Sequence, residues 1–89
     1  MIMKTSREEL AEQFGDDILL MDGYDDCVVG VVEQFGRPPI VCYDRDKVIR
    51  QLVNDGMTDE EAEEFFEYNQ IGACVGDRTP CFLTQIKNF

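Results

Sequence analysis

The chain has 89 residues, of which 44% are apolar, and a formal net charge of −11 at pH 7. This length suits one small acidic domain over residues 1–89, and the apolar share argues against a fully disordered chain. Phosphate backbones are bound by clustered Lys and Arg, so the acidic balance disfavours nucleic acid as a direct ligand.

The acids gather in two blocks. Eight acids and no base lie from Glu8 to Asp26, and seven acids and no base lie from Asp55 to Glu67. All eight bases lie outside these blocks, together with the four remaining acids. Because such blocks attract cations, we expect a basic protein surface to be the better partner.

The sequence contains no run of about 18 apolar residues, so we expect no transmembrane helix and no membrane partner. Its start, MIMKTSREEL, becomes charged before the apolar core of a signal peptide can form. The expected location is therefore the cytoplasm in which the protein is made.

The first predicted helix runs from Arg7 to Phe14. Ser6 and Glu9 have the spacing of a capping box, in which each side chain bonds to the other residue's backbone amide. Gly15 suits the position just after a helix end. The helix is only about two turns long, so packing must stabilise it.

A short strand is predicted next. The apolar run from Ile18 to Met21 is too short for a helix and is bounded by turn formers, of which Asp22-Gly23 is the clearest. The surrounding acids suggest a test for calcium. An EF-hand loop built on this turn would place apolar residues at ligand positions, so that match fails.

Two β-rich runs follow, from Cys27 to Phe35 and from Pro39 to Tyr43. The turn formers from Gly36 to Pro38 separate them, which predicts an antiparallel hairpin. Gly30 inside the first run indicates a bulge or close packing at that position.

Two helices are predicted after the hairpin, from Asp46 to Asn54 and from Asp59 to Gln70. Asp44 is the N-cap candidate of the first, and Thr58 with Glu61 forms a capping box at the start of the second. The short link between the helices predicts an antiparallel αα-hairpin whose apolar stripes cover one face of the sheet.

The run from Cys81 to Ile86 predicts a final strand, with Pro80 at its start or edge. The expected fold class is therefore α+β, with three helices and a small, mainly antiparallel sheet. The expected order is helix, strand, β-hairpin, αα-hairpin and final strand.

The second helix of the αα-hairpin is amphipathic. At 100° per residue its apolar side is formed by Ala62, Phe65, Phe66 and Asn69, and its acidic side by Glu60, Glu63, Glu64 and Glu67. One interpretation is a solvated face whose early carboxylates suit the positive helix N-terminus. The other is a ridge of negative charge presented to a basic partner.

The four cysteines each have apolar neighbours, which indicates small buried side chains with free thiols. They are Cys27, Cys42, Cys74 and Cys81. Their spacings of 15, 32 and 7 residues do not fit structural zinc, whose ligands come in pairs with about two to four residues between them. A metal or redox role for these cysteines remains an open alternative.

Residue types that commonly carry catalysis are scarce. The chain has no histidine, which removes the common general base and the usual partner of a nucleophilic cysteine. Neither a nucleophile elbow nor a phosphate-binding glycine loop occurs. A carboxylate pair for acid–base catalysis could be drawn from Asp16, Asp17, Asp25 and Asp26, but nothing in their sequence context suggests the burial that raises a pKa. We therefore expect no enzyme activity, no cofactor and no metal.

From about Asp22 to Phe82 the chain resembles a group of short hypothetical proteins of tailed bacteriophages and prophages. The matching residues are GVVE at 30–33, FG at 35–36, PP at 38–39, YD at 43–44, GMTDEEA at 56–62, FF at 65–66, YN at 68–69, GA at 72–73, G at 76, TP at 79–80 and F at 82. The group has no activity that could be transferred. The resemblance implies a small phage-derived protein in a bacterial host cytoplasm.

The first functional hypothesis is a non-catalytic interaction protein that docks an acidic surface on a basic host protein. The partner would be a nucleic-acid-binding or defence enzyme, inhibited by imitation of the charge of DNA. The candidate docking residues are Glu60, Glu63, Glu64, Glu67, Asp16, Asp17, Asp25 and Asp26. The alternative is a small structural or self-assembling protein, such as a homodimer, whose acidic face serves only solubility.

Overall fold

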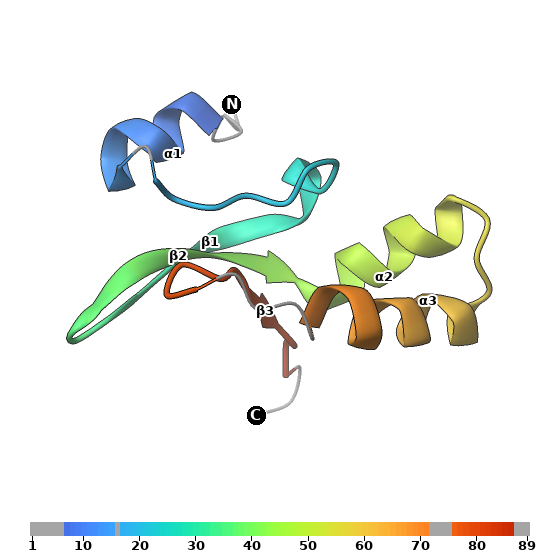
Figure 1. Cartoon of the computed structure of the whole chain (residues 1–89). Helices are drawn as coiled ribbons and strands as arrows, with labels where there is room; N and C mark the ends of the chain where they lie inside the picture. Colours follow the sequence, from blue (N-terminus) through green and yellow to red (C-terminus); the bar gives the residue numbers. More distant parts are fainter. Residues whose placement is uncertain (1–6, 16, 72–75, 87–89) are drawn as a thin grey trace.

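The structure is a computed structural model that describes residues 7–15, 17–71 and 76–86 (Figure 1). These residues form three α-helices, a three-stranded sheet and two short helical turns. In chain order they are α1 (Arg7–Phe14), the 3₁₀ turn η1 (Asp25–Cys27), β1 (Val28–Gln34), β2 (Arg37–Asp44), α2 (Arg45–Asn54), α3 (Asp59–Phe65), the π-helical turn η2 (Phe66–Ile71) and β3 (Cys81–Leu83). The α+β class is confirmed.

The sheet is mixed, with strand order β1-β2-β3. β1 and β2 form the predicted antiparallel hairpin, and β3 lies parallel to the other edge of β2. A parallel neighbour needs a long crossover connection, which α2 and α3 supply between β2 and β3. A register shift between Val28 and Gly30 puts a bulge at the predicted position.

Three boundaries differ by more than one residue from the sequence-based expectation. The turn of the hairpin is Phe35-Gly36, where Gly36 has a φ of +76°, so β2 begins already at Arg37. The final strand ends at Leu83 because its ladder with β2 is only three residue pairs long. The last helix is α-helical to Phe65 and continues as the wider turn η2.

The predicted strand from Ile18 to Met21 is wrong. Residues 17–24 form an irregular arm that lies along the sheet without joining it (Figure 1). Ile18 is buried in the core, and the backbone amide of Met21 donates a hydrogen bond to the Tyr43 hydroxyl at 2.7 Å. The apolar character of this run therefore reflects packing against the sheet rather than strand pairing.

The core lies between one face of the sheet, the arm and the pair α2–α3. Its fully buried side chains come from all of these except the arm: Val41 and Tyr43 from β2, Val48 from α2, and Ala62 and Phe66 from α3 and η2. These positions follow the predicted apolar stripes of the two helices.

Both predicted helix starts after the hairpin are confirmed. Asp44 caps α2 by accepting from the amide of Lys47 at 3.2 Å. Thr58 and Glu61 form the capping box of α3, with hydrogen bonds of 2.9 and 3.2 Å. The other proposed capping box, at Ser6, lies outside the described residues.

No helix in the described ranges is long and apolar enough to cross a membrane.

Candidate docking surface on the third helix

Four glutamates form an acidic ridge along α3 and η2. The members of the acidic ridge are Glu60, Glu63, Glu64 and Glu67, and all four are exposed. Ala62 and Phe66, on the opposite side of the helix, are completely buried. The helix is therefore oriented as the sequence predicts, with its carboxylates in solvent.

Three of the four ridge carboxylates are uncompensated. Arg45 of α2 lies 3.8 Å from Glu63 and stacks on the Phe66 ring, with its guanidinium carbon 5.1 Å from the ring centroid. Within the described part of the chain, no ion pair is made by Glu60, Glu64 or Glu67. Their charges are available to a cation from another molecule.

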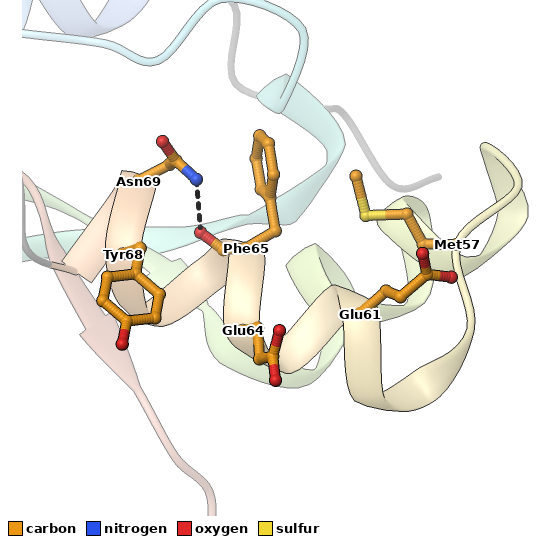
Figure 2. A pocket seen from close by; sticks show the side chains of 6 residues that line it. All are labelled: Met57, Glu61, Glu64, Phe65, Tyr68 and Asn69. Carbon is orange, nitrogen blue, oxygen red and sulfur yellow. Dashed lines mark hydrogen bonds between the residues drawn. The ribbon is translucent and has the colours of Figure 1, made fainter.

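An open groove of about 350 Å³ borders the ridge. Its lining is Met57, Glu61, Glu64, Phe65, Tyr68 and Asn69 (Figure 2). Tyr68 is 82% exposed, while Phe65 and Met57 are partly buried against the core. The α3 groove thus places apolar and aromatic surface directly beside carboxylates, and Glu64 belongs to both the ridge and the groove.

Local hydrogen bonds hold the two ends of the groove. At the start of α3 the backbone amide of Thr58 donates to Glu61, which lowers the pKa of that carboxyl and keeps it ionised. At the other end the Asn69 side chain donates to the Phe65 carbonyl at 3.3 Å (Figure 2). This bond lies where the helix widens into η2, a type of turn that often occurs at functional sites.

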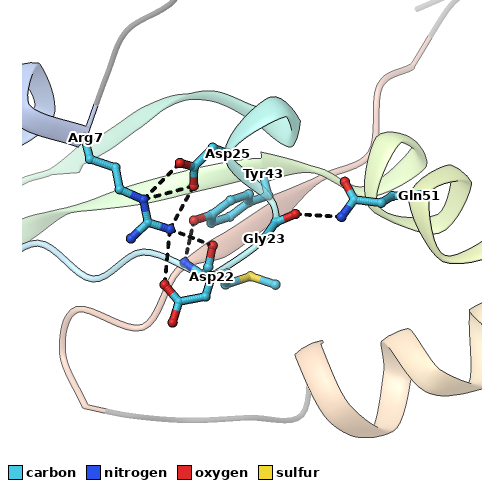
Figure 3. A network of polar contacts seen from close by, with 7 residues as sticks. Arg7, Asp22, Gly23, Asp25, Tyr43 and Gln51 are labelled. Atoms are coloured by element: carbon cyan, nitrogen blue, oxygen red, sulfur yellow. Dashed lines mark hydrogen bonds and ion pairs between the residues drawn. The ribbon is translucent and has the colours of Figure 1, made fainter. Parts of the chain in front are cut away.

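The N-terminal acidic block is partly compensated within the molecule. The guanidinium of Arg7 donates to both carboxylate oxygens of Asp25, and its Nη2 also lies 3.3 Å from Asp22 and from the Met21 carbonyl (Figure 3). The hydrogen bond from Arg7 lowers the pKa of Asp25. This network joins α1 to the arm, so Asp25 has a structural partner.

The other candidate residues of this block differ in their surroundings. Asp17 is paired with Arg78 at 3.0 Å. Asp26 is exposed, and Asp16 lies outside the described residues. The bases that pair with this block, Arg7 and Arg78, stand outside it in the sequence but are brought against it by the fold.

The arm that carries part of the N-terminal block is held against α2. Gln51 of α2 holds the arm by donating to the Gly23 carbonyl at 2.6 Å (Figure 3). Seen along α3, Phe65 and Asn69 point toward the arm, whereas Glu64 points away from it (Figure 2). Of the sequence-derived carboxylates, Glu64 of the ridge is the one that lines the groove.

Tyr68 and Met57 are absent from the sequence-based site. A helical wheel contains the signal, because Met57, Glu61, Glu64 and Tyr68 follow one another at intervals of three or four residues. The wheel does not reveal that the Tyr68 ring stays exposed, which depends on where α2 and the sheet end.

The chain matches no model of a known protein family, no curated protein and no solved structure. Its function is therefore inferred from the geometry of α3 and the side chains around it. Within the described residues no group of three or more His, Cys, Asp or Glu side chains is placed to hold a metal ion.

Proposed function

We propose that the protein is a non-catalytic interaction protein that docks the α3 surface on a basic surface of another protein. The observation that carries this proposal is that the acidic ridge, of which only Glu63 has a basic partner in the described residues, borders the α3 groove, with Glu64 shared by both. The complementary partner surface presents Arg or Lys side chains beside an apolar side chain.

The two parts of the surface have different physical roles. The ridge carboxylates steer a basic partner toward α3 and accept hydrogen bonds from its guanidinium or ammonium groups. The groove adds short-range affinity, because burying Tyr68 and Phe65 removes apolar area from water. Exposed tyrosines are common energetic centres of protein interfaces.

The groove favours docking over a face that serves only solubility. Carboxylates alone are sufficient for solubility, and single exposed apolar residues are ordinary on protein surfaces. A tyrosine that is 82% exposed beside carboxylates and next to a partly buried phenylalanine is a combined polar and apolar patch. Such patches are typical of binding sites.

The proposed setting is a bacterial cytoplasm, and the proposed partner is a host protein that normally holds nucleic acid. Phage-type proteins of this size and charge would act there as inhibitors, with the ridge taking the place of phosphates against arginines and lysines. The resemblance to phage proteins and the helical spacing of the ridge carboxylates support this part of the proposal.

The test is affinity capture from a bacterial lysate with two charge-reversed variants. One carries Glu60→Lys, Glu64→Lys and Glu67→Lys, and the matched control carries the same number of reversals at other exposed acids, Glu8→Lys, Glu12→Lys and Glu33→Lys. Wild type and control should capture the same partner at about 0.05 M salt and release it at about 0.5 M. Equal capture by the ridge variant would exclude the ridge as the docking surface.

A second candidate function is self-assembly, and the hairpin favours it. Phe35 at the tip is fully exposed, and Val29 and Val32 are about 40% exposed on β1, which is an edge strand. Sedimentation at increasing protein concentration distinguishes this candidate. A dimer that Phe35→Ser dissociates would support self-assembly, whereas a monomer at high concentration would count against it.

A further inference from the structure

Cys42 of β2 and Cys81 of β3 occupy directly paired positions in the parallel ladder. Paired residues of neighbouring strands point to the same face of a sheet. The other residues of this ladder, Tyr43 with Phe82 and Asp44 with Leu83, follow the same register. The two cysteines therefore lie side by side on one face, 39 positions apart in the chain.

The spacing of paired strands suits a disulfide. Neighbouring strands lie about 4.7–4.9 Å apart, which falls within the range of about 4.4–6.8 Å between the Cα atoms of disulfide-bonded cysteines. Both thiols are free. Burial raises the pKa of the Cys42 thiol to about 11, and the neighbouring Cys81 thiol adds to this rise.

Cys27, the third cysteine among the described residues, does not belong to this pair. Cys27 is buried in the core, where its Sγ donates to the Gln51 side-chain oxygen at 3.6 Å. Cys74 lies outside the described residues. Cys42 and Cys81 are thus set apart from the other cysteines by their paired positions in the sheet, and not by their spacing in the sequence.

We propose that Cys42 and Cys81 are a reversible oxidation site, which closes to a disulfide and fastens β3 to β2. The oxidant is a two-electron peroxide such as hydrogen peroxide. Cys81 is partly exposed and is the residue that meets the oxidant, whereas Cys42 is 7% exposed and resolves the intermediate.

The reaction balances in two steps. The Cys81 thiolate attacks one peroxide oxygen and breaks the O–O bond, which gives a sulfenic acid and, after protonation of the departing hydroxide, one water. The Cys42 sulfur then attacks the sulfenic sulfur, forms the S–S bond and displaces a second water. The thiols lose two electrons and two protons in total, and the peroxide is reduced to two waters.

A disulfide between Cys42 and Cys81 would stabilise β3, which is weakly attached to the sheet. β3 has only three residues and pairs with β2 through three positions. Phe82, next to Cys81, packs edge-on against Phe66 with ring centroids 4.8 Å apart. A disulfide would therefore secure the contact beneath η2 and would restrict the unfolded chain by closing a loop that contains α2 and α3.

The test treats the whole folded protein with hydrogen peroxide, blocks the remaining thiols, and maps disulfides by digestion and mass spectrometry. Wild type and the control variant Cys27→Ala should lose about 2 Da and yield a peptide linking Cys42 to Cys81 that a dithiol reductant separates. Cys81→Ala should yield no such peptide. The oxidised protein should melt roughly 10 °C or more above the reduced protein.

Two results would overturn the proposal. One is a predominant disulfide involving Cys27 or Cys74 in wild type. The other is the recovery of Cys42 and Cys81 as blocked free thiols after peroxide has oxidised methionines of the same sample, since the dose would then have been sufficient.

Discussion

Arg7 holds Asp25 through two parallel hydrogen bonds, each 2.9 Å long, from Nε and Nη2 to the two carboxylate oxygens. These residues are 18 positions apart, and Arg7 stands just before the acidic block to which Asp25 belongs. The pair turns part of an acidic stretch into a clasp between α1 and the first residue of η1, directly after the arm (Figure 3). Asp25 thus has a partner within the fold, whereas Glu60, Glu64 and Glu67 make no ion pair within the described residues.

Breaking this clasp should loosen the arm. In Arg7→Gln, Asp25 loses its bidentate partner, and the backbone amide of Met21 should exchange with solvent faster because the arm opens more often. Hydrogen exchange followed by NMR measures this rate. Arg37→Gln, on the exposed start of β2, is the matched control and should leave the Met21 rate unchanged.

Removing the Tyr43 hydroxyl should destabilise the fold. Tyr43→Phe leaves the Met21 amide without its acceptor at a partly buried position, which costs about 1–3 kcal/mol in the free energy of unfolding. Urea denaturation measures the loss. Tyr68→Phe makes the same chemical change on an exposed ring and should alter stability by less than about 0.5 kcal/mol. Equal effects of the two variants would contradict the assigned hydrogen bond.

Truncating the buried Phe66 should lower the free energy of unfolding far more than truncating the exposed Phe35. Phe66 is completely buried and contacts both Phe82 and Arg45, so Phe66→Ala should cost about 3–5 kcal/mol. Phe35→Ala at the exposed hairpin tip is the control, with an expected change of less than about 0.5 kcal/mol. Thermal and urea unfolding should both show that Phe66→Ala is less stable than Phe35→Ala.

Stability should fall at alkaline pH. Burial raises the pKa of Cys42 from 9.0 to about 11, and it also raises the pKa values of Cys27 and Tyr43. Above pH 9 the unfolded chain releases the Cys42 proton while the folded protein retains it, so ionisation favours unfolding. The contribution of the Cys42 proton to the free energy of unfolding is complete below about pH 9 and is lost as the pH approaches 11.

The shift of Cys42 corresponds to about 2–3 kcal/mol across that window. Urea unfolding of the reduced protein at a series of pH values measures this decline. Cys42→Ala should show a shallower decline over the same range. An identical slope in wild type and variant would mean that Cys42 does not titrate differently in the folded and unfolded chains.

The local features of the fold can be predicted from the sequence. Helix starts depend on residues three positions apart, so Asp44 and the Thr58–Glu61 pair identify the beginnings of α2 and α3. The apolar periodicity likewise identifies Ala62 and Phe66 as core. Such signals need no knowledge of the tertiary arrangement.

The non-local features are harder to predict. The direction of β3 depends on a crossover through two helices, and the arm looks like a strand until it is clear that no partner strand is beside it. The carboxylates that the sequence suggested as a site include both local and non-local features. Carboxylates of the ridge follow from the helix period, but the pairing of Asp17 with Arg78 depends on contacts between residues far apart in the chain.

Photo-crosslinking in bacterial cells tests the docking surface most directly. A benzoylphenylalanine placed at Tyr68 puts the reactive group beside the acidic ridge, and the same residue at Phe35 is the control at another exposed aromatic position. We expect a covalent adduct with one cellular protein from position 68, its loss when Glu60, Glu64 and Glu67 are reversed to Lys, and no such adduct from position 35. An adduct from position 35 alone, or none from position 68, would contradict docking through α3.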